Sequence, residues 1–181
     1  TPGARPSQGS MKSLKISDYE AIAKLEGVKA ASPMTNGSYV VIYQNKNWTT
    51  SVAGVNSNFQ DVNNWTMTSG RFFSDKNVQN RERVAVVGQT VVKNLFADED
   101  PVGKEIRVKN IPFRVIGVLK SKGNGTMGND QDDTVLIPYT TSMERVEGID
   151  YLRRGYVVAK DDEGIDRLQA DIENLLRVRH N

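Results

Sequence analysis

The sequence contains no cysteine and only one histidine, His180, which is the next-to-last residue. A chain without cysteine forms no disulfide and has no thiolate for zinc binding or nucleophilic catalysis. A Ser-His-Asp site needs a histidine held rigidly against its serine, and we expect a residue so near the terminus to fray. Both observations argue against cysteine and serine hydrolases and against thiolate zinc sites.

Long apolar runs and nucleotide-binding signatures are also missing. No stretch approaches the roughly 18 apolar residues of a membrane-spanning helix, and no charged-then-apolar leader opens the sequence. The pattern G-x-x-x-x-G-K-[ST] does not occur, so we expect no ATP binding through a Walker-type loop. The 24 basic and 22 acidic residues nearly balance, which gives no reason to expect a nucleic acid or an anionic membrane surface as partner.

What the sequence does contain is a regular run of elements in residues 83–118. The β-branched run Val84–Val87 is typical of a strand buried on both faces. Apolar residues then recur at helical spacing in residues 91–96, and Asp-Pro-Val-Gly at 100–103 predicts a tight turn. Residues 111–118 complete a two-stranded ribbon. None of these side chains is a nucleophile, a base or a metal ligand, so the stretch is predicted to be architectural.

Further elements are predicted on both sides of this stretch. Ser17 and Glu20 fit a capping box that would begin a helix. Residues 39–55 read as a β-hairpin, because two β-rich arms flank a polar turn. A strand around residues 151–159 precedes an amphipathic helix over about residues 164–179. The layout is therefore a hairpin and a helix, an α/β segment, and then a strand and a helix.

Three blocks of sequence carry a family resemblance: residues 83–118, Ser69-Gly-Arg-Phe-Phe73 before them and Val135-Leu-Ile-Pro-Tyr-Thr140 after them. In this order they resemble the extracytoplasmic (periplasmic) core domain of MacB-type ABC transporter permeases, a group that also includes LolC/LolE-like and FtsX-like permeases. The resemblance ends in the terminal Leu175-Leu-Arg-Val-Arg-His180 and therefore covers nearly the whole chain.

The resemblance implies an α+β fold with two lobes. A porter-like mixed α/β lobe is expected from both chain ends, residues 1–74 and 150–181, with a smaller α/β lobe, residues 75–149, inserted between them. The amphipathic C-terminal helix needs an apolar sheet to cover, which agrees with a lobe built from both ends of the chain.

The resemblance also implies a function without catalysis and without a cofactor. The domain would lie on the extracytoplasmic side of the plasma membrane, between two membrane-spanning helices of a permease that works as a homodimer. It would carry the motion driven by an ATP-binding subunit or domain to a membrane-fusion (adaptor) protein or to the exported substrate. The rival interpretation is a sensor or regulatory domain, as in FtsX-like or peptide-sensing permeases. A free-standing hydrolase would need an acid/base pair that we do not find.

Residues 121–133 form a polar, glycine-rich segment, which is long for a loop in a compact domain. Its side chains cannot build a core, so we expect this loop to be a contact surface of the transporter. If the flanking strands, residues 113–119 and 134–137, were hairpin neighbours, a turn of two to five residues could connect them. The candidate partner-binding residues are Ser121, Lys122, Gly123, Asn124, Gly125, Thr126, Met127, Gly128, Asn129 and Asp130.

Two other interpretations of this loop are weaker. Residues 123–128 match G-x-G-x-x-G, but a dinucleotide site needs a helix to follow, and a strand is predicted instead. Asp130, Asp132 and Asp133 lack the ligand spacing and the closing glutamate of a calcium loop. We interpret them as solvated loop carboxylates.

Overall fold

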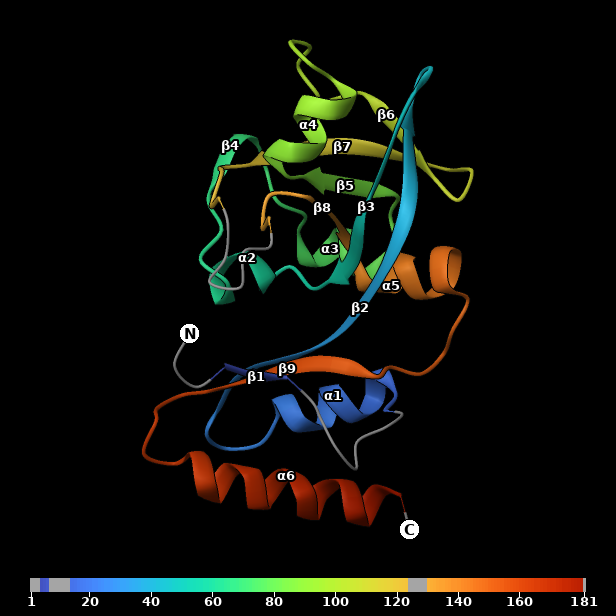
Figure 1. Ribbon diagram of the computed structural model, residues 1–181. Helices are drawn as coiled ribbons and strands as arrows, with labels where there is room; N and C mark the ends of the chain where they lie inside the picture. Colours follow the sequence, from blue (N-terminus) through green and yellow to red (C-terminus); the bar gives the residue numbers. More distant parts are fainter. Residues whose placement is uncertain (1–3, 7–13, 124–129, 181) are drawn as a thin grey trace. The chain divides into compact units, whose positions relative to one another are not determined.

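The computed structural model describes residues 4–6, 14–123 and 130–180 of the protein (Figure 1). It has the mixed α/β composition predicted from the sequence, which confirms the fold class. The chain divides into two compact units, residues 1–35 with 149–181 (unit 1) and residues 36–148 (unit 2). In chain order the elements are β1 (Ala4–Pro6), α1 (Ile16–Ala23), β2 (Val28–Tyr43), β3 (Lys46–Val55), α2 (Phe59–Val62), β4 (Met67–Gly70), α3 (Asp75–Gln79), β5 (Val84–Val87), α4 (Gln89–Leu95), β6 (Glu105–Val108), β7 (Ile111–Leu119), β8 (Thr134–Pro138), α5 (Tyr139–Thr141), a π-helical turn (Ser142–Glu147), β9 (Arg154–Ala159) and α6 (Ile165–Arg179).

Unit 1 is a small antiparallel sheet accompanied by two helices. The strand β9 lies between β1 and the first part of β2, with Val157 opposite both Arg5 and Ala31. The ring of Tyr19 on α1 packs directly over Gly155 of β9, where a Cβ atom would lie 2.2 Å from the tyrosine oxygen. The predicted apolar face of α6 is confirmed, because Leu168, Ile172 and Leu176 are buried.

The helix α1 begins two residues earlier than the sequence suggests. Its N-cap is Lys15, and the carboxylate of Asp18 accepts a hydrogen bond from the Lys15 backbone N–H at 2.9 Å. The predicted capping box of Ser17 and Glu20 is therefore wrong. The backbone N–H of the N-cap has no partner within the helix, and an aspartate in the first turn accepts its hydrogen bond. A glutamate at that position would form the same bond in a capping box.

Unit 2 is a closed β-barrel. Among its described residues, β2 pairs with β3, β3 with β8, β8 with β5, β5 with β7, β7 with β6, and β6 returns to β2. One edge of β7 pairs with two strands, because its first half pairs with β6 and its second half with β4. Closing the circuit leaves little unpaired strand edge, which is the general advantage of a barrel.

The interior of the barrel holds the main hydrophobic core. All four residues of β5 are buried, as predicted for this β-branched run. Helix α4 adds Val91 and Leu95 to the same core, and Phe96 stacks on Tyr43 of β2 with ring centroids 4.3 Å apart. The predicted strand, helix, turn and ribbon of residues 83–118 are thus the centre of unit 2.

The hairpin between β6 and β7 turns through Lys109 and Asn110, whose φ angles are +51° and +63°. Two successive positive φ values are the signature of a type I′ turn, which matches the twist of a hairpin. Lysine rarely adopts this conformation. Here its ammonium group donates a hydrogen bond to the carbonyl of Val146 at 2.8 Å.

The first boundary between the units differs from the predicted division after residue 74. It falls inside β2, between Thr35 and Asn36, so the hairpin of β2 and β3 contributes to the barrel. The reason is the parallel pairing of β3 with β8, which runs from Ser51–Thr134 to Val55–Pro138. Pairing over such a separation in sequence is not visible in the pattern of either strand. The second predicted boundary, after residue 149, lies one residue from the observed one.

The strands that flank residues 121–133 are not hairpin neighbours. β5 lies between them, parallel to β7 and antiparallel to β8. The connection must therefore cross two strand spacings, about 10 Å, over the end of β5. The condition for a hairpin turn of two to five residues, that the two strands are neighbours, is therefore not met.

No described helix combines the length and the apolar composition that crossing a membrane requires.

We predict that residues 36–148 fold without the rest of the chain, because the barrel and its core close within them. Residues 75–149 should not, since they lack β2 and β3, so that β8 and β6 each lose one of their two neighbouring strands and the barrel cannot close. Urea unfolding can be followed by the fluorescence of Trp48 and Trp65, with circular dichroism for the shorter fragment. A cooperative transition of the 75–149 fragment would contradict this division.

Candidate functional site

The loop that follows β7 supplies the candidate partner-binding residues. Ser121, Lys122 and Gly123 lie on its outgoing arm, and Asp130 begins the returning arm. Asn124, Gly125, Thr126, Met127, Gly128 and Asn129 lie outside the described residues. The two arms meet, because the backbone N–H of Gln131 donates to the carbonyl of Gly123 at 3.1 Å. The described part of the candidate site is therefore the base of the loop.

The side chain of Asp132 holds this base together. Its carboxylate accepts hydrogen bonds from the Ser121 hydroxyl at 2.5 Å, the Lys122 backbone N–H at 2.7 Å and the Gly123 backbone N–H at 3.1 Å. Asp132 is only 5% exposed. We call Ser121, Lys122, Gly123 and Asp132 the Asp132 clamp. A buried carboxylate with three donors is a strong local restraint, because hydrogen bonds to charged acceptors are stronger than neutral ones.

Two opposing effects set the pKa of Asp132. Burial raises it, because a low-dielectric surrounding disfavours the charged form. The hydrogen bonds of the clamp and the charge of Lys122 lower it by more, so the pKa lies below the ordinary value of 3.8. The carboxylate is therefore charged at neutral pH, as its three donors require.

The returning arm crosses the end of β5 in close contact with Gly88. The Gly88 N–H donates to the carbonyl of Thr134 at 2.9 Å, and the Thr90 N–H donates to the carbonyl of Asp132 at 3.2 Å. A Cβ atom on Gly88 would lie 2.2 Å from the Asp132 carbonyl oxygen. Only glycine leaves room for this crossing. The Thr90 hydroxyl also bonds the carboxylate of Asp130 at 2.5 Å, which ties the arm to the start of α4.

The outgoing arm is anchored by Lys122. Its ammonium group lies 4.1 Å from the centre of the Trp65 ring, within the range of a cation–π contact, and donates to the carbonyl of Asn63. Burial lowers the pKa of this lysine, and the nearby charge of Asp132 opposes that shift. The Trp65 side chain thus packs against a lysine of the same loop.

Asp132 and Asp133 are not solvated carboxylates, which corrects the interpretation made from the sequence, whereas Asp130 is exposed. Besides the bonds of Asp130 and Asp132, one oxygen of Asp133 accepts from the Trp48 indole N–H at 2.9 Å and from the Thr50 hydroxyl at 2.7 Å. Each acid binds protein donors, and no group of three metal-ligating side chains occurs among the described residues. The base of the loop is therefore built to hold a segment of chain in place.

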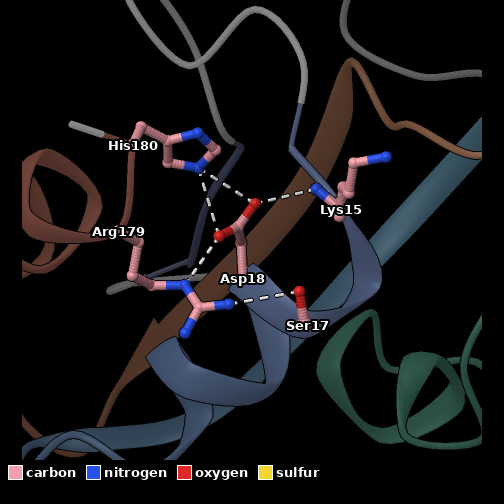
Figure 2. A network of polar contacts seen from close by, with 5 residues as sticks. All are labelled: Lys15, Ser17, Asp18, Arg179 and His180. Carbon is pink, nitrogen blue, oxygen red and sulfur yellow. Dashed lines mark hydrogen bonds and ion pairs between the residues drawn. The ribbon is translucent and has the colours of Figure 1, made fainter.

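A second polar network lies in unit 1, around Asp18 (Figure 2). Asp18 accepts from the Lys15 N–H, from the Arg179 guanidinium Nε at 2.8 Å, and lies 3.2 Å from Nε2 of His180 with both oxygens. Arg179 also donates to the Ser17 hydroxyl at 3.1 Å. We call these five residues the Asp18 cluster. The end of α6 is thus bound to the start of α1, so the expectation that His180 frays is wrong.

Asp18 is 2% exposed, and burial alone would raise its pKa. The hydrogen bonds from Lys15 and Arg179 and the interaction with His180 outweigh burial, so the pKa is lower than the ordinary value of 3.8. Neither this cluster nor the Asp132 clamp was found from the sequence. The only signals in the sequence were an aspartate at the start of a predicted helix, for Asp18, and an aspartate in a glycine-rich loop, for Asp132, and both are too common to select these residues.

The sequence and structure match known proteins over nearly the whole chain. A family model for the MacB-like periplasmic core domain matches residues 1–175. The macrolide export ATP-binding/permease protein MacB of Rhodospirillum rubrum is 44% identical over 181 residues, covering 99% of this chain. The protein of that name from Marinobacter nauticus is 37% identical over 179 residues, again covering 99% of this chain. This chain spans only 28% of the length of each of these relatives.

Solved structures share the fold. The crystal structure of the periplasmic region of MacB from Actinobacillus actinomycetemcomitans matches with a TM-score of 0.83 at 25% identity, covering 98% of this chain and 82% of that one. The extracellular domain of the noncanonic ABC-type transporter YknZ from Gram-positive bacteria gives 0.82 at 21% identity, covering 94% and 86%. At 21% identity, the likeness to the YknZ domain shows the fold alone.

Replacing Asp132 should destabilise the barrel. Asp132→Ala leaves a hydroxyl and two backbone N–H groups without their acceptor, which should lower the free energy of unfolding by about 2–4 kcal/mol. The control is Asp98→Ala, which removes an exposed carboxylate and should change the free energy by less than about 0.5 kcal/mol. Urea titrations of the 181-residue chain measure both values. Equal stability of the two variants would show that the clamp is not a restraint.

The Asp18 cluster predicts a pH dependence of stability. A carboxyl whose pKa is lower in the folded than in the unfolded state stabilises the folded protein. This stabilisation is complete above the pKa of the unfolded state and is lost as the pH falls through the pKa of the folded state. The melting temperature of the wild type should therefore exceed that of Asp18→Asn by a gap that is widest at pH 5 and narrows towards pH 3. Asp162→Asn, at an exposed position, should show no such gap. A gap that stays constant from pH 5 to 3 would contradict the lowered pKa.

Proposed function

The chain belongs to the family of MacB-like periplasmic core domains, and from this we propose that it is the extracytoplasmic domain of an ABC transporter permease. The family match over residues 1–175 carries the proposal. The structural likeness to the periplasmic region of a MacB protein supports it. The domain lies on the periplasmic or extracellular side of the plasma membrane, between segments of the permease that span it.

In this proposal the domain is not an enzyme. The relatives are named ATP-binding/permease proteins, and this chain corresponds to 28% of their length. ATP hydrolysis belongs to a domain or subunit outside this chain, and the permease works as a homodimer. The domain passes the resulting motion to an adaptor protein or to the exported substrate. Its own polar clusters act as restraints within the fold, which suits a part that transmits force.

The surface proposed to meet the partner is residues 121–130. The Asp132 clamp and the Gly123–Gln131 hydrogen bond already close the connection over β5. Residues 124–129 are therefore not needed to join β7 to β8. A segment that the fold does not require, presented from a rigid base, is a common way to build a contact surface.

The experiment replaces residues 124–129 with Gly-Gly and keeps both arms of the loop. Two residues can span the gap, because Gly123 and Gln131 are already joined by a hydrogen bond. The melting temperature of the isolated chain should change by less than about 2 °C. In the full transporter, adaptor binding and export should fall at least tenfold while basal ATPase activity persists.

The matched control exchanges Asp162 and Glu163, two exposed residues of another polar loop, for Gly-Gly. It should leave binding, export and ATPase activity unchanged. If export and adaptor binding both survive the loss of residues 124–129, the loop is only a spacer. A variant that no longer binds adaptor but responds to a peptide ligand would instead favour the sensor interpretation.

A further inference from the structure

The chain passes between unit 1 and unit 2 at two places. The first crossing lies within β2, between Thr35 and Asn36, and the second lies between Gly148 and Ile149. Gly148 directly follows the π-helical turn and has a φ angle of +63°. Two units joined by two segments of chain change their relative orientation by bending those segments. The contacts that hold the two segments therefore decide how far the units can turn.

A tyrosine and a glutamate join the two segments on the side of unit 2. Tyr39 lies three residues after Asn36, and Glu147 lies directly before Gly148. The Tyr39 hydroxyl donates a hydrogen bond to the Glu147 carboxylate. Glu147 is half-buried, and burial raises the pKa of its carboxyl. It forms no ion pair with any described residue, so the tyrosine hydroxyl is the donor that offsets its burial.

Further contacts fix both segments to the barrel. The ammonium group of Lys109, in the turn between β6 and β7, donates to the carbonyl of Val146 at 2.8 Å. It also lies 6.0 Å from the centre of the Tyr39 ring, at the outer limit of a cation–π contact. The side-chain oxygen of Asn36 accepts a hydrogen bond from the Ser51 hydroxyl on β3 at 2.8 Å. Each segment is thus bonded to the barrel as well as to the other segment.

Gly37 packs directly against the tyrosine and the glutamate. A Cβ atom on this residue would lie 2.6 Å from Cε2 of Tyr39 and 3.1 Å from a carboxylate oxygen of Glu147. Gly37 does not have a positive φ angle, so the glycine is required for space rather than for backbone conformation. We call Gly37, Tyr39, Lys109 and Glu147 the Tyr39 latch.

We propose that the Tyr39 latch is a conformational device that limits the movement of unit 1 relative to unit 2. While the latch is closed, residues 36–39 and 146–148 are held together, so bending is confined to the residues next to the crossings. When the Tyr39–Glu147 bond opens, each segment bends separately and over more residues, and the units reach a wider range of orientations. This inference goes beyond the proposed function, because it concerns the freedom of two units within one chain.

The alternative is that the tyrosine and the glutamate only stabilise the barrel. Tyr39 does pack against the hydrophobic core from a partly buried position. A second pair on the same strand provides a comparison, because the Tyr43 hydroxyl donates to Glu99 at 3.2 Å. Neither member of that pair adjoins a crossing. If both pairs were only supports of the barrel, the loss of either hydroxyl would have the same effect on the movement of the units.

The lack of cysteine allows spin labels to be placed at chosen positions of the 181-residue chain. Lys76→Cys on α3 and Glu173→Cys on α6 put one nitroxide at an exposed position of each unit. Double electron–electron resonance measures the distribution of distances between the labels. Tyr39→Phe should broaden this distribution by about 1.5-fold or more, because the state with parted segments becomes more populated. Tyr43→Phe, the matched control, should leave the width unchanged.

Variants at two other positions test the same bond by different means. Gly37→Ala keeps every polar group of the latch, but its methyl group displaces the Tyr39 ring and should broaden the distribution as Tyr39→Phe does. Alanine restricts the backbone more than glycine, so a stiffer segment alone would have the opposite effect. Glu147→Gln retains an acceptor oxygen and should keep the wild-type width, whereas Glu147→Ala should broaden the distribution.

A label pair within unit 2, Lys76→Cys with Lys93→Cys, measures the barrel by itself. Its distribution should stay unchanged in every variant, and thermal melts verify that each variant is folded. If the distance between the units is already as broadly distributed in the wild type as in Tyr39→Phe, the latch does not limit movement and the inference is wrong. It is also wrong if Tyr43→Phe has an equal effect, or if the pair within unit 2 broadens as well, because the latch is then only a support of the barrel.

Discussion

The short strand β5 sets the constraint on which the barrel depends. Its four residues are all buried, and β7 and β8 flank it on opposite sides. The chain that leaves β7 must therefore pass over the end of β5 before it can enter β8. The crossing is possible because Gly88 has no side chain there, and the Asp132 clamp fixes the path of the crossing chain. A buried carboxylate is the suitable group, since one side chain satisfies a hydroxyl and two backbone amides at once.

The sequence predicts the local elements of this architecture but not the pairing between them. The run Val84–Val87, the apolar face of α6 and the arms of the hairpin follow from periodicity, which is a local property. The pairing of β3 with β8 joins residues more than eighty positions apart, and neither strand carries a mark of its partner. The division of the chain into lobes depends on that pairing, which explains why a boundary drawn after residue 74 separates strands that belong to one barrel.

The sequence did not predict the polar networks around Asp132, Asp133 and Asp18, for a related reason. Asp132 and Asp133 sit in a glycine-rich, acidic segment that reads as solvated. The donors of Asp133, Trp48 and Thr50, come from the distant strand β3, and those of Asp132 come from the opposite arm of the loop. Asp18 binds Arg179 and His180, whose position near the end of the sequence suggested fraying. Burial decides the role of a carboxylate, and burial depends on tertiary contacts rather than on neighbours in sequence.

Asp130 and Asp132 link the loop at residues 121–133 to the interior of the barrel. Asp130 bonds the first turn of α4 through Thr90, and the carbonyl of Asp132 accepts from the N–H of that same threonine. Helix α4 in turn contributes Val91 and Leu95 to the core. A load applied to residues 124–129 would thus reach α4 and β5 directly, because both arms of the loop are bonded at their base. Transmission of motion requires such short, stiff connections, since a loop held only by its own backbone would absorb the displacement.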